Sequence, residues 1–200
     1  MAQIISLLAI GFFFGLRHAF DADHIAAVSI FSAQSLNKKA SLLKGIFWGL
    51  GHTLVLFIVG IFVLFLGFKI PERMSAFFET GVSFLLIGLG GYSLYKTRGQ
   101  THSHPPLGMH THNSSSFLVG IIHGLAGSAA IFVLIISTIR SAILGLLYIL
   151  VFGLGTIAGM VFVSFFIGIA TLRVKKYAGF AAGVFSLSLG IFLLFSSKFF

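Results

Sequence analysis

The sequence predicts an all-α polytopic membrane protein with six transmembrane helices, arranged as two inverted three-helix repeats. The composition is the first reason: of 200 residues, 58% are hydrophobic and only 8% are charged. Several continuous apolar runs also exceed about 18 residues, the length typical of a transmembrane helix. Because these runs do not alternate, they argue against a transmembrane β-barrel. The third reason is that motifs of the first half recur, in order, in the second.

The chain is predicted to be a single transmembrane domain over residues 1–200. Repeat 1 covers 1–95, a polar loop covers 96–116, and repeat 2 covers 117–200. The short links between apolar runs define the spans. These are Ile4–Phe31, Ser41–Phe68, Ser75–Tyr95, Phe117–Ile139, Ala142–Leu172 and Ala178–Phe199.

The basic residues lie mainly at the ends of the apolar runs, where they set orientation. The net charge of +9 comes with no basic block, so we expect no nucleic-acid partner. Eight basic residues fall on one side of the membrane and four on the other, which predicts a cytoplasmic loop 96–116 and external termini in the cell membrane. The eight are Lys38, Lys39, Lys44, Lys96, Arg98, Arg173, Lys175 and Lys176; the four are Lys69, Arg73, Arg140 and Lys198.

Three matches support the repeat. Residues 15–18 align with 120–123 at an offset of 105, and 49–52 align with 153–156 at an offset of 104. Gly81 and Gly88 align with Gly183 and Gly190 at an offset of 102. Three spans per half force the two copies to insert in opposite senses. Inverted repeats of this kind are common in secondary transporters, which bind substrate near the midplane.

The most informative segment is 17–24 in the first apolar run, which carries five ionisable residues: Arg17, His18, Asp21, Asp23 and His24. A charge at the bilayer centre costs about 2.5–3.5 kcal/mol on insertion scales, so such groups mark ion or substrate paths. The chain has no cysteine, so we expect any metal to be held by imidazole, carboxylate, hydroxyl or backbone groups. Histidines favour a late first-row metal such as nickel or cobalt. We expect an exchangeable site rather than a closed structural cage.

Two geometries for this segment remain open. On a straight helix, His18, Asp21 and His24 form one stripe, and Asp23 points away. A break near 19–22 would instead let Asp23 and both histidines converge, as in the interrupted helices of transporters. The alternative to a ligand role for Asp21 is an ion pair with Arg17 at the i, i+4 spacing.

Other histidines are candidate ligands. His52 lies inside the second span, and His123 occupies the repeat position of His18. The second half has no counterpart of the acidic pair, because Asp21 and Asp23 align with Ala126 and Ser128, so the site is asymmetric. In the polar loop we expect metal capture or sensing, with a solvated linker as the alternative. The loop histidines are His102, His104, His110 and His112.

Residues 18–24 fit the pattern His-x4-Asp-His, which resembles the defining motif of the nickel/cobalt transporter (NiCoT) family. Gly51-His52-Thr53 resembles that family's second motif. The match is weaker in the second half, where Ser164 stands in place of an expected aspartate, and the usual eight spans are reduced to six. These departures resemble a shorter branch of nickel transporters and urease-accessory membrane proteins.

These observations favour a secondary transporter that moves Ni²⁺ or Co²⁺ as substrate, with uptake as the favoured direction and efflux as the alternative. No phosphate loop is present, so the chain carries no ATP motor. We expect no prosthetic group and no enzymatic activity, because an intramembrane metalloprotease would need a helical His-Glu-x-x-His motif. A third hypothesis is a non-transporting accessory protein that docks a metal chaperone or a urease or hydrogenase maturation partner. The oligomeric state is left open.

Overall fold

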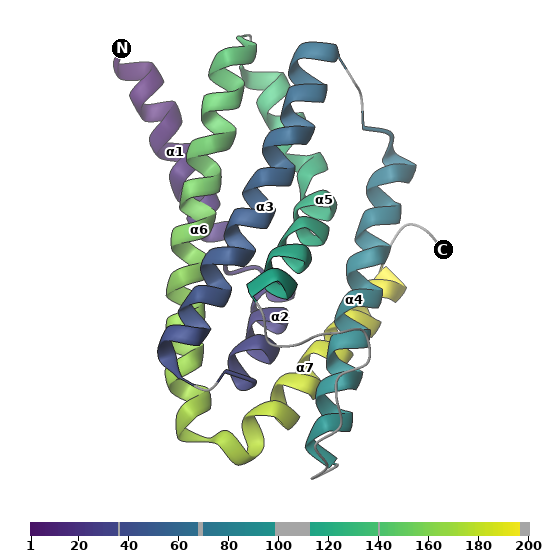
Figure 1. The fold of residues 1–200 in the computed structure, drawn as a ribbon. Coiled ribbons are helices and arrows are strands. Elements are labelled where there is room, and N and C mark those ends of the chain that lie inside the picture. The colour runs from purple at the N-terminus through teal and green to yellow at the C-terminus, as the bar shows by residue number, and fades with distance from the viewer. Residues whose placement is uncertain (36, 68–69, 99–112, 140, 197–200) are drawn as a thin grey trace.

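The structure, a computed structural model, describes residues 1–35, 37–67, 70–98, 113–139 and 141–196. These residues form seven α-helices and no strand (Figure 1). In chain order the helices are α1 (Ala2–His18), α2 (Ala22–Ala33), α3 (Lys38–Leu66), α4 (Glu72–Arg98), α5 (Asn113–Thr138), α6 (Ala142–Arg173) and α7 (Lys175–Ser196).

The predicted first span is interrupted. Helices α1 and α2 are separated by a short break and are bent by 57° relative to each other. Of the two geometries left open by the sequence, the structure has the broken helix. The break lies at residues 19–21, inside the window in which an interruption would bring the histidines together.

Four helices, α3, α4, α6 and α7, are long and apolar enough to cross a membrane, and the bent α1–α2 pair is a fifth candidate. The fourth predicted span, 117–139, lies within α5 except for its last residue. The described part of the chain therefore carries four or five candidate spans, and the sixth stays a prediction. Helix α4 continues to Arg98 and α5 begins at Asn113, so the ends of the predicted loop 96–116 are helical. The four loop histidines lie outside the described residues.

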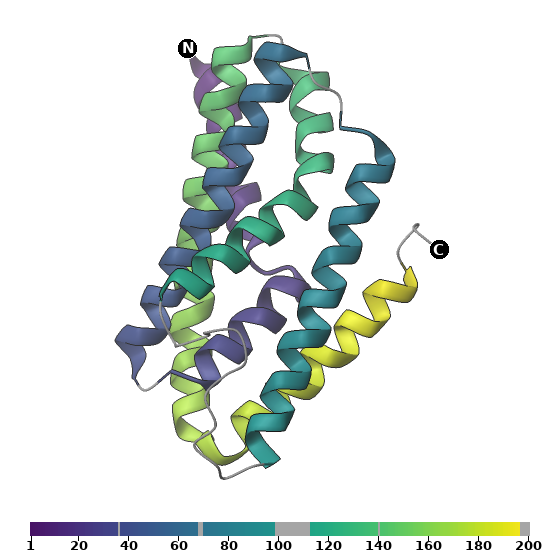
Figure 2. The ribbon, with the colours of Figure 1, turned by 45° about the vertical axis from the view of Figure 1, so that its right-hand side comes forward.

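Helices α3 and α6 pack against each other at the centre of the bundle. Helix α1 packs along α6, α5 packs along α3, and α4 pairs with α7 (Figures 1 and 2). Helix α2 turns inward against α6 and α7. Helix α5 also changes direction partway along its length (Figure 2). The inward turn of α2 buries His24, which follows the break and is 1% exposed.

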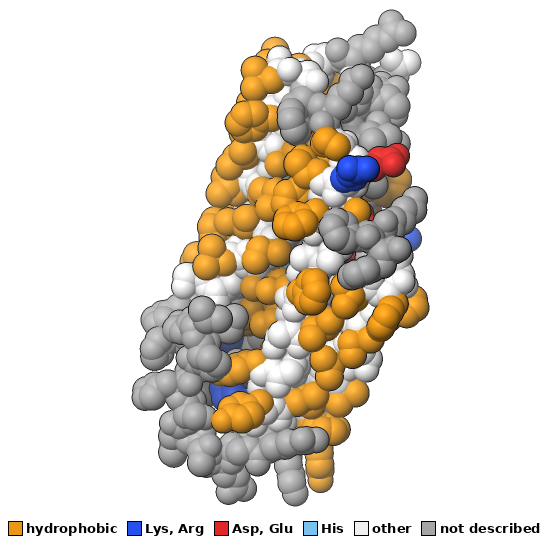
Figure 3. Space-filling view, turned by 90° about the vertical axis from the view of Figure 1, so that its right-hand side faces the viewer, with side chains coloured by type: hydrophobic (Ala, Val, Ile, Leu, Met, Phe, Trp, Pro, Cys, Tyr) orange, Lys and Arg blue, Asp and Glu red, His pale blue; other side chains and the backbone are white. Residues whose placement is uncertain are grey.

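The face of the molecule formed around α4 and α7 is largely hydrophobic, as expected of a surface that meets lipid (Figure 3). Exposed apolar side chains continue on the other helices, for example Phe13 on α1, Phe65 on α3 and Phe162 on α6. Because few polar side chains interrupt them, the outer surface matches a bilayer rather than water.

Lys44 is a correction to the loop-charge count. It lies inside α3, only 5% exposed, and its ammonium group donates a hydrogen bond of 2.9 Å to the carbonyl oxygen of Phe31 at the end of α2. A cation suits the C-terminal end of a helix, where the carbonyls are unpaired and the dipole is negative. Lys44 therefore holds the end of α2 against α3 instead of marking a loop.

Close helix contacts depend on glycine. A Cβ atom at Gly120 of α5 would overlap the carbonyl oxygen of Trp48 on α3. A Cβ atom at Gly15 of α1 would overlap the carbonyl oxygen of Phe152 on α6. Without a hydrophobic driving force between helices in lipid, such close approach is a main source of association.

We predict that Gly120→Ala destabilises the folded protein by about 1–3 kcal/mol, because the new methyl group must push α5 away from α3. Gly88→Ala is the matched control, since a Cβ atom there meets nothing within 4 Å. Thermal unfolding of both purified variants in detergent measures the difference. Equal melting temperatures would contradict the tight α3–α5 contact.

Candidate metal centre

The break between α1 and α2 places the candidate ligands. Asp21 has extended backbone angles, φ −63° and ψ 148°, and stands at the N-cap of α2. The N–H of Phe20 donates to the carbonyl oxygen of Arg17 at 2.9 Å, and the N–H of Asp21 donates to that of His18 at 3.0 Å. These bonds satisfy backbone groups that would otherwise be unpaired in an apolar environment.

Three imidazoles converge beside the break: His18 at the end of α1, His24 in the first turns of α2 and His52 on α3. The ring centroids of His18 and His24 are 4.6 Å apart, and the ring of His52 lies 5.2 and 5.4 Å from them. One ligand nitrogen from each ring lies within 4.8 Å of the others. Histidine–metal bonds of about 2.0–2.1 Å around a tetrahedral ion place the ligand nitrogens about 3.4 Å apart. Shifts of up to about 0.7 Å at each nitrogen would therefore bring these three nitrogens to coordination distance.

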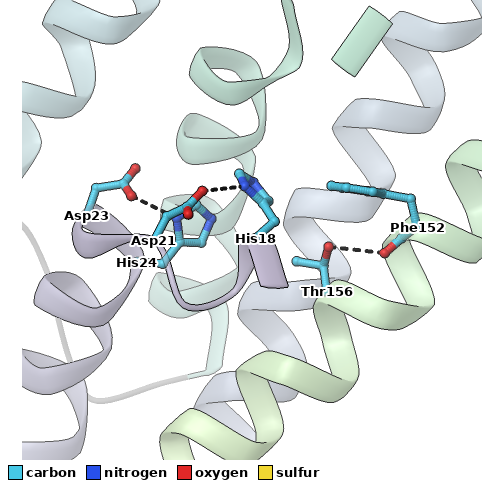
Figure 4. Close-up of polar contacts among 6 residues, drawn as sticks. All are labelled: His18, Asp21, Asp23, His24, Phe152 and Thr156. Carbon is cyan, nitrogen blue, oxygen red and sulfur yellow. Dashed lines mark hydrogen bonds and ion pairs between the residues drawn. The ribbon is translucent and has the colours of Figure 1, made fainter. Parts of the chain in front are cut away.

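The two aspartates hold the histidine rings (Figure 4). Nδ1–H of His18 donates to a carboxylate oxygen of Asp21 at 2.7 Å, and Nδ1–H of His24 donates to one of Asp23 at 3.0 Å. Donation through Nδ1 fixes the tautomer and leaves Nε2 as the free base. Both Nε2 atoms are buried and have no hydrogen-bond partner among the described residues. Asp21 and Asp23, expected as ligands, each accept a hydrogen bond from a histidine that is a candidate ligand.

His123 of α5 is the fourth imidazole of the cluster. Its ring lies 5.3 Å from that of His24, and the side chain is 1% exposed. Nδ1–H of His123 donates to the carbonyl oxygen of Val119 at 3.2 Å, and its Nε2 atom has no partner in the described part of the chain. Both ring nitrogens of His52 are also buried and unpartnered there. A buried polar nitrogen without a partner is costly, so these four histidines are candidate metal ligands.

Two aromatic residues that the sequence analysis did not select also shape the cluster. The indole of Trp48 stacks on His24 at 5.9 Å with an interplanar angle of 7°, and lies 5.1 Å from the ring of His123. The ring of Phe152 packs 5.6 Å from that of His18. Trp48 precedes His52 by four residues on the same face of α3, and that spacing was the available signal. For Phe152 the available signal was its alignment with Trp48 at the offset of 104 between the two halves.

The proposed ion pair between Arg17 and Asp21 is wrong. Asp21 bonds to His18, and no salt bridge joins it to Arg17 in the described structure. Arg17 is exposed instead.

Thr156, which takes the repeat position of His52, donates its hydroxyl to the carbonyl oxygen of Phe152 at 3.1 Å (Figure 4). A hydroxyl used in this way bonds within its own helix, so the second half contributes His123 to the cluster from α5 and no hydroxyl ligand at Thr156.

The fold and the cluster together define a multi-pass membrane protein with imidazoles suited to a late first-row metal ion. Residues 4–89 match the NicO family, described as High-affinity nickel-transport protein. The chain is 41% identical over 188 residues to Urease accessory protein UreH of a Bacillus species, an alignment that covers 87% of this chain and 82% of that protein. The chain belongs to the NicO family of nickel transporters, which is not a family of enzymes.

Two further relatives are more distant. The High-affinity nickel transport protein of Cupriavidus necator is 34% identical over 77 residues, which cover 38% of this chain and 21% of that protein. Chloroplast protein FOR GROWTH AND FERTILITY 2 of Arabidopsis thaliana is 25% identical over 218 residues, covering 98% of this chain and 58% of that protein. No solved structure matches. The match to the NicO family and the similarity to UreH confirm the resemblance to nickel transporters that the sequence motifs suggested.

We predict that Asp21→Asn weakens Ni²⁺ affinity about 10–100-fold, because an amide no longer holds His18 with Nε2 free and basic. Titration calorimetry of the purified protein measures the affinity. Glu72→Gln is the control, since Glu72 lies at the start of α4, away from the cluster. Unchanged affinity in Asp21→Asn would show that the carboxylate does not set the tautomer of His18.

Proposed function

We propose that the chain is a secondary transporter that carries Ni²⁺, or the chemically similar Co²⁺, across the cytoplasmic membrane. The cluster of His18, His24 and His52 would bind the ion, with His123 as a fourth ligand. The observation that carries this proposal is the convergence of buried, unpartnered ring nitrogens from four helices at an interrupted span. Transporters commonly bind ions at such breaks.

The charge of the cluster supports a divalent substrate. With neutral imidazoles, Asp21 and Asp23 give two negative charges, and no basic side chain is paired with them in the described structure. A bound divalent cation would neutralise this pair. Three or four imidazoles favour nickel or cobalt over magnesium or calcium, which prefer oxygen ligands.

Alternating access by two inverted repeats is the second part of the proposal. The reciprocal glycine contacts support it: Gly15 meets Phe152, and Gly120 meets Trp48. The first residues of each pair are 105 apart and the second residues are 104 apart, the same offsets that relate the sequence motifs. A pseudo-two-fold axis in the membrane plane would generate such reciprocity.

Helices α4 and α7 also make reciprocal glycine contacts, but with a different offset between the two halves. Gly90 of α4 meets the backbone of Leu187 on α7, and Gly190 of α7 meets the backbone of Ile87 on α4. Both correspondences have an offset of 100 rather than the 102 expected from the glycine alignment. The bend in α5 would then be the counterpart of the break between α1 and α2 (Figure 2).

We propose uptake as the direction. Inward movement of a divalent ion down an inside-negative potential releases about 4.6 kcal/mol per 100 mV, from about 2.3 per charge. This would drive accumulation without an ATPase, with external termini and the loop 96–116 on the cytoplasmic side. Efflux would need a coupled counter-ion.

The second candidate is an accessory role, in which the chain hands nickel to a maturation partner instead of catalysing flux alone. The relative named Urease accessory protein UreH favours it, since the chain covers 82% of that protein. The loop histidines would then dock the partner. Flux through the purified chain alone separates the two candidates.

Ni²⁺ binding at the cluster should quench the fluorescence of Trp48, the chain's single tryptophan, because the indole stacks on His24. We predict that His18→Ala and His24→Ala each abolish both the quenching and high-affinity binding. Quenching that persists at the same Ni²⁺ concentration in either variant would remove that histidine from the site. Retained monodisperse elution verifies that each variant is folded.

In proteoliposomes with an inside-negative potential, the wild-type chain should accumulate Ni²⁺, and Asp23→Asn should lose most of that uptake. Parallel assays with Co²⁺, Zn²⁺ and Mn²⁺ give the selectivity. Tight binding without flux of any metal would overturn uptake by this chain alone and favour the accessory role.

A further inference from the structure

A cavity of about 410 Å³ lies between α2, α4, α5 and α7, beside the histidine cluster. Its walls carry the carboxylates of Asp23 and Glu79, and no lysine or arginine lines it. The chain as a whole has four acidic residues and a net charge of +9. Half of all acidic residues therefore face one cavity in a strongly basic protein.

The two carboxylates differ in their exposure to the outside of the protein. Glu79 is an exposed residue, seven positions into α4, and accepts a hydrogen bond of 3.2 Å from the hydroxyl of Ser75. Ser196, at the exposed end of α7, also lines the cavity. Asp23 is 29% exposed, and one of its oxygens accepts the bond from His24. The cavity thus runs from an exposed acidic residue to the carboxylate that holds a candidate ligand.

We propose that this cavity is an acidic vestibule through which a hydrated divalent cation reaches the histidine cluster, with Glu79 as the residue that attracts it. This inference rests on the proposed transport function, whose site it extends. Even at about 30 Å³ per water, the cavity has room for an ion with a shell of about six waters. Low-dielectric walls that carry one sign of charge focus the field and raise the local concentration of counter-ions.

Asp23 has two functions in this arrangement. Its first oxygen orients His24, and the rest of the carboxylate faces the vestibule. An arriving ion meets Asp23 before it meets the imidazole nitrogens, so the carboxylate helps to strip water from the ion as ligands are exchanged. Glu79 acts earlier, by charge alone, and touches none of the histidines.

The first test measures the electrostatic potential of the vestibule and does not depend on transport. Because the chain has no cysteine, Ser196→Cys and Leu193→Cys each introduce a single reactive thiol into the wall. We compare the reaction rates of a cationic and an anionic methanethiosulfonate reagent, normalised to Gln3→Cys at the exposed start of α1. The vestibule should favour the cationic reagent about tenfold, and Glu79→Gln should reduce that preference about threefold.

The second test is Ni²⁺ uptake by Glu79→Gln without added cysteines. KM should rise about threefold to tenfold with kcat within about twofold, and the difference should shrink at high ionic strength. Equilibrium affinity for Ni²⁺ should stay within about twofold of the wild type. Glu72→Gln, the same change on the same helix but outside the cavity, should leave KM unchanged.

Thiols that fail to react at both positions, or react with the charge preference of the control, would overturn the vestibule. An unchanged KM in Glu79→Gln would do the same, while wild-type uptake that depends on His18 would leave the transport function standing. Conversely, a clear cation preference without Ni²⁺ flux would support the vestibule and reject transport by this chain alone.

Discussion

The hydrogen bond between His18 and Asp21 is the interaction on which the site depends. On a straight helix, six residues separate His18 from His24 by about 9 Å along the axis, too far to share an ion. In the broken helix the ring centroids of His18 and His24 are only 4.6 Å apart. Because a bilayer cannot hydrate an interrupted backbone, the break must be satisfied internally. Two tight backbone bonds and the Asp21 carboxylate meet that requirement.

The arrangement of the acids changes the electrostatic interpretation of the motif. Had Asp21 been paired with Arg17, the cluster would carry a single negative charge, and a divalent ion would overcompensate it. With Arg17 exposed and unpaired with Asp21, two carboxylates stand behind two imidazoles. A carboxylate that accepts a hydrogen bond from Nδ1 raises the basicity of Nε2 without occupying a coordination position. An ion bound as proposed would still be able to leave, as transport would require.

The sequence was sufficient for the all-helical class with several apolar spans, and it selected four histidines that the structure brings together as candidate ligands. Apolar runs located the helices to within a few residues, and the charged segment in the first run identified the histidines. The break could not be chosen from periodicity, because His18, Asp21 and His24 already share one helical face. Nor could the direction of the Asp21 side chain be chosen, since Arg17 and His18 are both within its reach. Lys44 was counted with the loop charges because its contact with the carbonyl oxygen of Phe31 joins residues 13 apart and has no signature in the local sequence.

The proposed repeat explains why a nearly symmetric frame would hold one asymmetric site. In the proposed repeat, Trp48 and Phe152 occupy equivalent positions, and they pack against different imidazoles, those of His24 and His18. His18 and His123 are likewise equivalent, yet only the first half carries aspartates. Symmetric helix packing would let the two halves exchange conformations with similar contacts, as alternating access requires. Because the aspartates lie in one half only, the proposed repeats would build one asymmetric site between them rather than two equivalent ones.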